Sequence, residues 1–190
     1  LFNVLDGDII FNDVRLNDLS VDERAKAGIF LAMQDPTVVD GVTNSEFLKN
    51  AYEEQTESHI DYFKFISEVN KSLDDLMFSR DMIHRDVNAG FSGGEKKKNE
   101  VLQIKMLKPK LIILDEIDSG LDVDSLKIVC ENINEYKNTF PNTSILIITH
   151  YPRILEAIKP DCVHIMKNGK IVKTGDLSLA LETEQVGYNE

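Results

Sequence analysis

The stretch that decides the fold reads FSGGEKK at residues 91–97 and, after a spacer, LIILDEIDSGLD at residues 111–122. Four aliphatic residues followed by Asp115 and Glu116 predict a buried parallel strand that carries carboxylates at its C-terminal end. Open α/β sheets bind their ligands at that end of their strands. The two glycines after Ser92 leave backbone N–H groups free at a predicted helix start, which suits an anion. These residues therefore predict an α/β fold with an anion site at one edge of its sheet.

The two acids at the end of this strand have different predicted roles. Asp115 is placed to hold Mg²⁺, directly or through water, because Mg²⁺ is bound by one or two carboxylates together with phosphate oxygens. Glu116, one residue further on, is placed to accept a proton from an attacking water. The acidic segment 115–124 does not have the ligand spacing of a calcium-binding loop. The pattern therefore favours Mg²⁺ over Ca²⁺ at this strand end.

Two further apolar runs, at residues 28–33 and 144–148, predict buried strands. Gln34 follows the first run, and by itself it is best interpreted as a polar residue leaving a strand. His150 follows the second run after one residue. An isolated histidine is more often structural, but its place at the end of a core strand parallel to residues 111–114 favours a catalytic interpretation. Both side chains are therefore candidate site residues.

The rest of the chain contains clear helix and turn signals. A capping box at Ser20 and Glu23 predicts a short helix that ends near Ala27. Apolar residues at helical spacing predict helices within residues 43–86. The Asn168-Gly169 pair between two short apolar segments predicts a hairpin with a type I′ turn.

An SGGE motif about twenty residues before an apolar strand that ends in Asp-Glu resembles the signature and Walker B motifs of ABC ATPases. Either motif alone is weak, but the combination is highly specific. Most ABC ATPases continue the Walker B glutamate with Pro-Thr, whereas this chain has Ile117-Asp118. That variation, the segment 85–97 and THY at residues 149–151 are similar to the SufC family, the soluble ABC ATPases of the Suf iron–sulfur cluster assembly machinery. The resemblance extends over residues 7–188.

The resemblance implies an α/β fold of the P-loop NTPase class, an ABC ATPase domain with a mixed or parallel sheet core and an inserted helical subdomain. Residues 1–42 and 87–190 would form the core, and residues 43–86 the helical subdomain. The chain starts at Leu1 and contains no G-x-x-x-x-G-K-[ST] phosphate loop. We interpret it as part of a longer protein that begins after that loop. The 190 residues alone are expected to bind ATP poorly, because the loop supplies the backbone cradle and the lysine for the phosphates.

The resemblance also implies ATP and Mg²⁺ as cofactors and gives each candidate residue a role. Glu116 would be the catalytic base, and His150 the switch histidine that contacts both the γ-phosphate and that glutamate. Asp115 and Gln34 would bind Mg²⁺, Gln34 being similar to the Q-loop glutamine. The nucleotide would be contacted by Gln34, Ser92, Gly93, Gly94, Glu95 and Asp122. In this family the signature loop covers the nucleotide held by the other protomer, so residues 92–94 would act in trans.

The implied function is that of the ATPase subunit of the Suf complex, which uses ATP at a dimer interface to drive conformational change in a scaffold. The implied partners are the SufB and SufD scaffold proteins and a second ATPase subunit in a transient ATP-dependent dimer. The implied location is the bacterial cytoplasm or a plastid- or apicoplast-type organelle. Two alternatives are kept. One is the nucleotide-binding subunit of a membrane ABC transporter, against which Ile117-Asp118 and Lys96-Lys97 count. The other is a docking fragment without ATP hydrolysis.

The bulk composition agrees with a protein-binding role. The net charge of −12 argues against a nucleic-acid or anionic-membrane surface, which requires a basic face. The longest wholly aliphatic runs have four residues, far short of the ~20 that a membrane helix needs. Cys130 and Cys162 lie far apart and form neither a disulfide framework nor a metal knuckle. We therefore expect no nucleic-acid partner and no membrane insertion.

Overall fold

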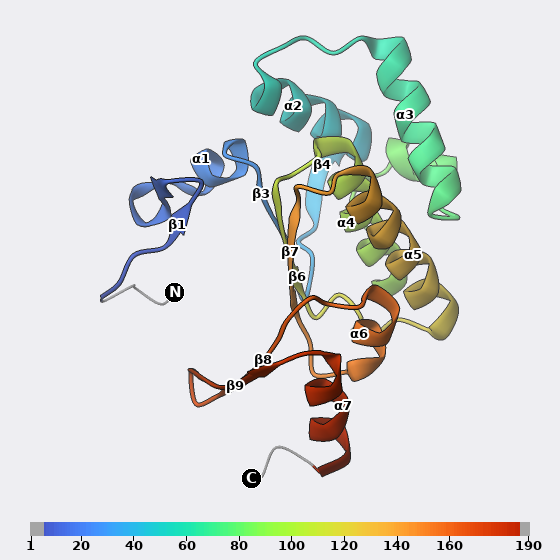
Figure 1. The fold of residues 1–190 in the computed structure, drawn as a ribbon. Coiled ribbons are helices and arrows are strands. Elements are labelled where there is room, and N and C mark those ends of the chain that lie inside the picture. The colour runs from blue at the N-terminus through green and yellow to red at the C-terminus, as the bar shows by residue number, and fades with distance from the viewer. Residues whose placement is uncertain (1–5, 187–190) are drawn as a thin grey trace.

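The computed structural model describes residues 6–186, and Figure 1 shows their arrangement. Seven α-helices, two 3₁₀ helices and nine strands occur within these residues. In chain order they are β1 (Ile10–Phe11), β2 (Val14–Arg15), η1 (Leu16–Asp18), α1 (Val21–Lys26), β3 (Ile29–Ala32), β4 (Val39–Thr43), α2 (Asn44–Thr56), α3 (Tyr62–Asp75), η2 (Arg80–His84), β5 (Asp86–Val87), α4 (Gly93–Leu107), β6 (Leu111–Asp115), α5 (Val123–Thr139), β7 (Ser144–Ile148), α6 (Pro152–Ile158), β8 (Val163–Lys167), β9 (Lys170–Gly175) and α7 (Leu177–Val186).

The central sheet has three parallel strands in the order β3-β6-β7. Ala32 of β3 lies opposite Leu114 of β6, and Asp115 of β6 lies opposite Ile148 of β7. The three strands therefore end at the same edge of the sheet. This is the edge at which parallel sheets place their ligands, and the segments that follow the three strands begin there.

The two faces of this sheet differ in burial, and this corrects the prediction that residues 28–33 and 144–148 form buried strands. Ala32 and Leu114 are fully buried on one face, whereas Leu31, Leu146 and Ile148 on the other face are 47–49% exposed. The cause is visible in Figure 1, where α4 and α5 cover one face only. Within residues 6–186 the strands are therefore half-buried, and only alternate side chains enter the core.

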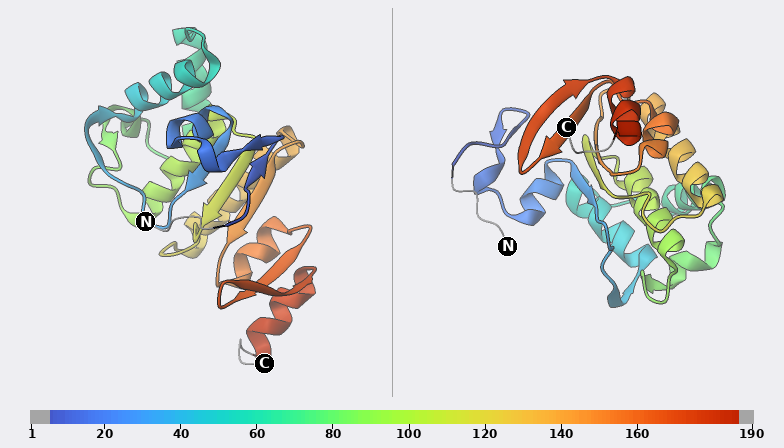
Figure 2. Two further views of the ribbon diagram at one scale, coloured as in Figure 1. Left: turned by 90° about the vertical axis from the view of Figure 1, so that its left-hand side faces the viewer. Right: turned by 90° about the horizontal axis from the view of Figure 1, so that it is seen from below.

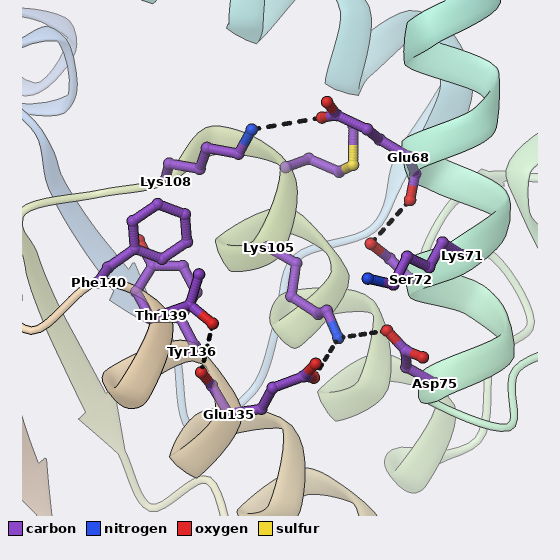
Figure 3. A pocket seen from close by; sticks show the side chains of 11 residues that line it. Glu68, Lys71, Ser72, Asp75, Lys105, Lys108, Glu135, Tyr136, Thr139 and Phe140 are labelled. Atoms are coloured by element: carbon purple, nitrogen blue, oxygen red, sulfur yellow. Dashed lines mark hydrogen bonds and ion pairs between the residues drawn. The ribbon is translucent and has the colours of Figure 1, made fainter.

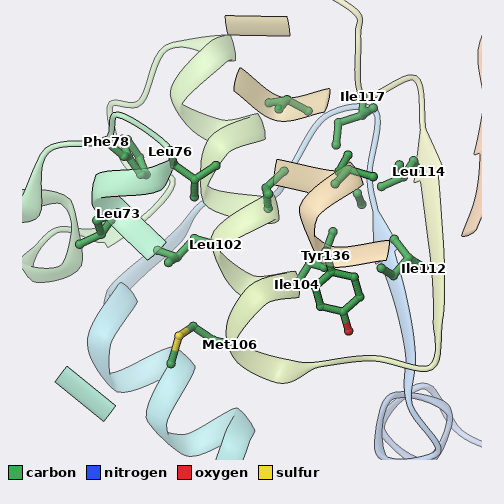
Figure 4. Packing of buried hydrophobic residues seen from close by; sticks show 14 of the residues in the cluster. Leu73, Leu76, Phe78, Leu102, Ile104, Met106, Ile112, Leu114, Ile117 and Tyr136 are labelled. Atoms are coloured by element: carbon green, nitrogen blue, oxygen red, sulfur yellow. The ribbon is translucent and has the colours of Figure 1, made fainter. Parts of the chain in front are cut away.

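The hydrophobic core lies between this sheet face and the helices, with α4 at its centre. Figure 4 shows Leu102, Ile104 and Met106 of α4 between residues of the helical segment and residues of β6. Each of these three side chains is at most 2% exposed. Cys130 of α5 is buried here, and burial raises the pKa of its thiol to about 11. Helix α4 is thus the element on which the remaining layers pack.

Helices α2 and α3 and the 3₁₀ helix η2 fall within residues 43–86, in agreement with the helical pattern predicted there. Thr43 caps α2 through a capping box with Glu46. On α3, Phe65 is 1% exposed and packs in the core, whereas Phe63 is 87% exposed. The division of the chain into a core and a helical subdomain remains a prediction.

Two small antiparallel hairpins, β1–β2 and β8–β9, lie apart from the central sheet (Figure 2). The β8–β9 turn has positive φ at both Asn168 (51°) and Gly169 (75°), as a type I′ turn requires. The predicted capping box of α1 is also present, between Ser20 and Glu23. In the part of the chain that the structure describes, no helix is long and apolar enough to cross a membrane.

Candidate functional site

Three side chains from the ends of three neighbouring strands meet at the carboxyl edge of the sheet. Gln34 Nε2 donates a hydrogen bond to Glu116 Oε2 at 2.7 Å, and His150 Nδ1 lies 3.2 Å from Glu116 Oε1. The carboxylate of Glu116 is 25% exposed and the imidazole of His150 is 50% exposed. A glutamate held between an amide and an imidazole, yet open to solvent, is able to accept a proton from a nearby water.

The backbone of Glu116 is in a conformation that non-glycine residues rarely adopt. Its φ is +47°, in the left-handed region, which typically costs a residue about 1–3 kcal/mol unless the surroundings hold it. Here the Glu116 N–H donates to the carbonyl of Ile148 at 2.9 Å, which extends the β6–β7 pairing by one residue. The turn that follows the strand directs this side chain toward Gln34 and His150.

The residues present at this edge suit Mg²⁺. Asp115 is the last residue of β6 and is partly exposed. Within residues 6–186 its carboxylate makes no hydrogen bond or ion pair, so its oxygens are available to a cation. Gln34 uses its Nε2 for Glu116, which leaves its Oε1 as a second oxygen ligand. One carboxylate and one amide oxygen, completed by phosphate oxygens and water, form a donor set that Mg²⁺ accepts.

The second group of predicted residues surrounds the start of α4. Ser92 is the N-cap: its Oγ accepts from the Glu95 N–H at 3.3 Å, and its own N–H donates to Glu95 Oε2 at 2.7 Å. This reciprocal bonding lowers the pKa of the Glu95 carboxyl. Gly93 and Gly94 are the first two residues of the helix, where backbone N–H groups have no partner within the helix. The loop is thereby shaped to receive an anion.

Asp122 lies beside this loop as the N-cap of α5. Its carboxylate accepts from both the N–H and the Oγ of Ser125, each at 2.8 Å, and these bonds lower its pKa. A methyl group at Gly94 would lie 3.5 Å from Ser125 Oγ, so the two helix starts are close together. Within residues 6–186 no hydrogen bond or ion pair joins this group to Gln34, Glu116 or His150. The structure thus places the predicted residues in two separate groups.

Sequence reasoning missed a buried carboxylate that supports the strand end before His150. Asp118 is fully buried and accepts hydrogen bonds from Thr149 Oγ1 at 3.0 and 3.2 Å. Thr149 Oγ1 in turn accepts from the N–H of Tyr151 at 2.9 Å. These bonds link the turn after β6 to the turn after β7. The departure from Pro-Thr at residues 117–118 was the only sequence signal for this role.

Sequence reasoning also missed the pair Lys97 and Glu100, which lies beneath the segment that carries Gln34. Both side chains are almost fully buried, at 3% and 6% exposure, with Lys97 Nζ 3.5 Å from Glu100 Oε2. Lys97 donates to the carbonyl of Met33, and Glu100 Oε1 accepts from the Met33 N–H at 2.7 Å. Burial raises the pKa of Glu100 to about 7, although Lys97 and the Met33 N–H favour the charged form. The lysine run after the glycines therefore includes one buried cation.

The raised pKa of Glu100 predicts a dependence of stability on pH. Its folded pKa of about 7 exceeds the ordinary 4.5, so the folded chain binds more protons between these values than the unfolded chain does. The free energy of unfolding should therefore fall as pH rises from 4.5 to 7, by at most ~3 kcal/mol, and level off above that. Urea unfolding of the wild type and Glu100→Gln, which cannot titrate, isolates this contribution. A difference between the two chains that stays constant from pH 5 to 8.5 would contradict it.

The comparisons with known proteins identify the family. Residues 2–119 match the model of the family described as ABC transporter. The chain belongs to the ABC transporter ATPase family. The P-loop NTPase fold of ABC ATPases, predicted from the signature and Walker B motifs, is thereby confirmed. ATPase domains of this family bind ATP, typically with Mg²⁺, and in general hydrolyse it. The chain is an ATP-binding subunit of an ABC transporter-type system.

Relatives match the chain along almost its whole length. It is 46% identical over 192 residues to the "Probable ATP-dependent transporter ycf16" of Cyanophora paradoxa, covering 99% of this chain and 73% of that protein. It is 45% identical over 190 residues to "Vegetative protein 296" of Bacillus subtilis, covering 99% of this chain and 72% of that protein. These identities support the family assignment independently of the motif match.

A solved ATP-binding cassette shares the fold. A dimeric cassette in a post-hydrolysis state bound to ADP and Pi superimposes with a TM-score of 0.77 at 15% identity, covering 91% of this chain and 74% of that one. A second structure of an ATP-binding cassette, with the same TM-score and identity, is also described as dimeric.

Proposed function

We propose that this chain is the ATPase subunit of the Suf iron–sulfur cluster assembly machinery, with SufB and SufD as its scaffold partners. The observation that carries the proposal is the burial of Ile117 and Asp118, both 0% exposed. These are the two residues at which the chain departs from the Pro-Thr of most ABC ATPases and resembles the SufC family. Asp118 accepts hydrogen bonds from Thr149, next to His150. The residue that replaces the usual threonine therefore supports the strand end that carries His150.

The residues at the carboxyl edge of the sheet have separate roles in ATP hydrolysis. Glu116 accepts the proton of the attacking water through the carboxylate that Gln34 and His150 orient. Asp115 and the Oε1 of Gln34 would hold Mg²⁺, and bound Mg²⁺-ATP would supply the phosphoanhydride bond to be cleaved together with charge neutralisation at its phosphates. His150, half-exposed beside Glu116, would donate a hydrogen bond to the γ-phosphate.

The second group of residues is assigned to the partner's nucleotide. Ser92, Gly93 and Gly94 lie apart from Glu116 and present a capped helix start, and Asp122 stands beside them. A site divided in this way is complete only when two subunits face each other. The proposal therefore includes a transient ATP-dependent dimer in which residues 92–95 and Asp122 of one subunit close over the nucleotide of the other.

One experiment separates the two candidate partners. The full-length protein is co-expressed, in separate cultures, with a SufB–SufD pair and with a candidate membrane permease, and each complex is purified through the partner. Co-purification with the scaffold, with faster ATP turnover in the complex, is expected. Membrane transport is the second candidate, because the name of the Cyanophora paradoxa relative describes a transporter. Recovery only with the permease would overturn the Suf assignment.

Docking of the scaffold is predicted to involve residues 37–80, which include helices α2 and α3. Glu57, Phe63 and Lys64 are exposed in this segment, Phe63 at 87%, and loss of an aromatic anchor or reversal of rim charge weakens association. Glu57→Lys with Lys64→Glu and Phe63→Ala keeps the net charge and is expected to reduce scaffold recovery at least ~10-fold. Lys173→Glu on β9 serves as the control on a distant exposed strand. Equal recovery of both variants would place the docking surface elsewhere.

A further inference from the structure

The segment that carries Gln34 is attached to α4 at three points. At its start, both backbone polar groups of Met33 are bonded by side chains of α4. In its middle, Lys96 Nζ lies 3.1 Å from the carboxylate of Asp35. At its end, the carbonyl of Thr37 accepts from Asn88 Nδ2 at 2.8 Å, and Asn99 of α4 donates to Asn88 Oδ1 at 3.0 Å. The position of this segment is therefore defined by α4.

Lys97 and Glu100 form an attachment built from two almost fully buried charged side chains, at 3% and 6% exposure. Taking two charges out of water carries a penalty that their attraction often does no more than repay, so a buried pair is poor evidence for a stabilising role. This pair is distinguished by its hydrogen bonds to a single residue. Lys97 donates to the carbonyl of Met33, and Glu100 accepts from the Met33 N–H. The next residue is Gln34, whose side chain reaches Glu116.

We propose that Lys97 and Glu100 are positioning residues that fix Gln34 against Glu116 by bonding both the N–H and the carbonyl of Met33. Neither residue touches the reacting atoms, so each acts through Gln34. The same helix begins at the Ser92 cap, so α4 connects the loop offered to the partner subunit with the Gln34 segment. The consequence for ATP turnover rests on the proposed function, whereas the positioning itself does not.

The test follows the two groups that the pair controls, by NMR of a ¹⁵N-labelled full-length chain. In the wild type the Met33 amide should exchange slowly with solvent, because its acceptor is a buried carboxylate. In Lys97→Met with Glu100→Leu, which removes both charges at similar volume, Met33 exchange should accelerate about 10-fold, the effect of losing roughly one hydrogen bond. The Gln34 side-chain NH₂ signals should also shift, as they should in Glu116→Ala.

Two further variants make the test specific. Glu100→Gln alone keeps an acceptor for the Met33 N–H. Its Met33 amide exchange and its Gln34 side-chain signals should therefore remain as in the wild type. Lys105→Met removes another charged side chain of α4, which Figure 3 shows between Asp75 and Glu135 on the side of α3 and α5, and should leave Met33 and Gln34 unchanged. An unprotected Met33 amide in the wild type would overturn the proposal even if the double variant fails to fold. Unchanged Gln34 signals in a folded double variant would overturn it equally.

A double-mutant cycle links positioning to function. If the pair acts through Gln34, then adding Gln34→Ala to the Lys97→Met, Glu100→Leu variant should lower turnover no further than Gln34→Ala does alone. Additive losses would contradict action through Gln34. A wild-type chain without ATP turnover would disprove the proposed function. The NMR signals of Met33 and Gln34 would still test whether Lys97 and Glu100 position Gln34.

Discussion

Glu116→Gln is expected to lower steady-state ATP turnover by about 10²–10⁴-fold in a chain to which a phosphate loop has been restored. Glutamine keeps the size of the side chain and an oxygen that accepts from Gln34, but it cannot take a proton from water. Nucleotide affinity should change little, because Asp115 and the Oε1 of Gln34 are untouched. The measurement is phosphate release at saturating ATP, with nucleotide affinity determined in parallel.

The same variant should accumulate as an ATP-bound dimer, because in the proposed mechanism closure precedes the blocked step and the loops at residues 92–94 contact the partner's nucleotide. Light scattering with ATP present measures the dimer fraction. Asp115→Asn is the matched comparison, since it should weaken Mg²⁺ binding itself, and His150→Ala should slow turnover by removing the second contact to Glu116. Near wild-type turnover in Glu116→Gln would refute the catalytic assignment. An inactive variant that never dimerises would refute the shared site.

The sequence predicted the two elements that organise the fold because each carried independent local signals. Four aliphatic residues before Asp115 predict a strand, and the two glycines after Ser92 predict a helix start, and both elements were found at these residues. The contact between His150 and Glu116 was predicted from family motifs, because the two residues follow separate strands, whereas the hydrogen bond from Gln34 to Glu116 was not predicted. The roles assigned to them in catalysis remain predictions.

Other features depend on which elements cover which face, and no local pattern reports that. The apolar runs of β3 and β7 have the composition of strands buried on both sides, yet only one face is covered within residues 6–186. Lys97 and Glu100 stand in a charged run that is typical of a solvated helix face, and they are buried because the Gln34 segment lies across them. Asp122 carries a second role, as a helix cap, that its motif conceals.

The two faces of the central sheet differ in burial, and truncation of a leucine on the buried face is expected to have the largest effect on stability. Leu114→Ala should lower the free energy of unfolding by about 2–5 kcal/mol, the range for a leucine removed from a close-packed core. Leu114 is fully buried beneath α4 and α5 and belongs to the cluster drawn in Figure 4. Urea unfolding of the 190-residue chain, followed by circular dichroism, measures the change.

Leu146→Ala is the matched control, because it removes the same atoms from the neighbouring strand on the other face. Leu146 is 49% exposed, so much of its surface already contacts water in the folded chain, and its truncation should cost less than about 1 kcal/mol. Equal losses in the two variants would mean that the second face is covered in solution, for instance by self-association. Dilution of the chain would then reduce the effect of Leu146→Ala while leaving that of Leu114→Ala unchanged, because only a cover supplied by another molecule depends on concentration.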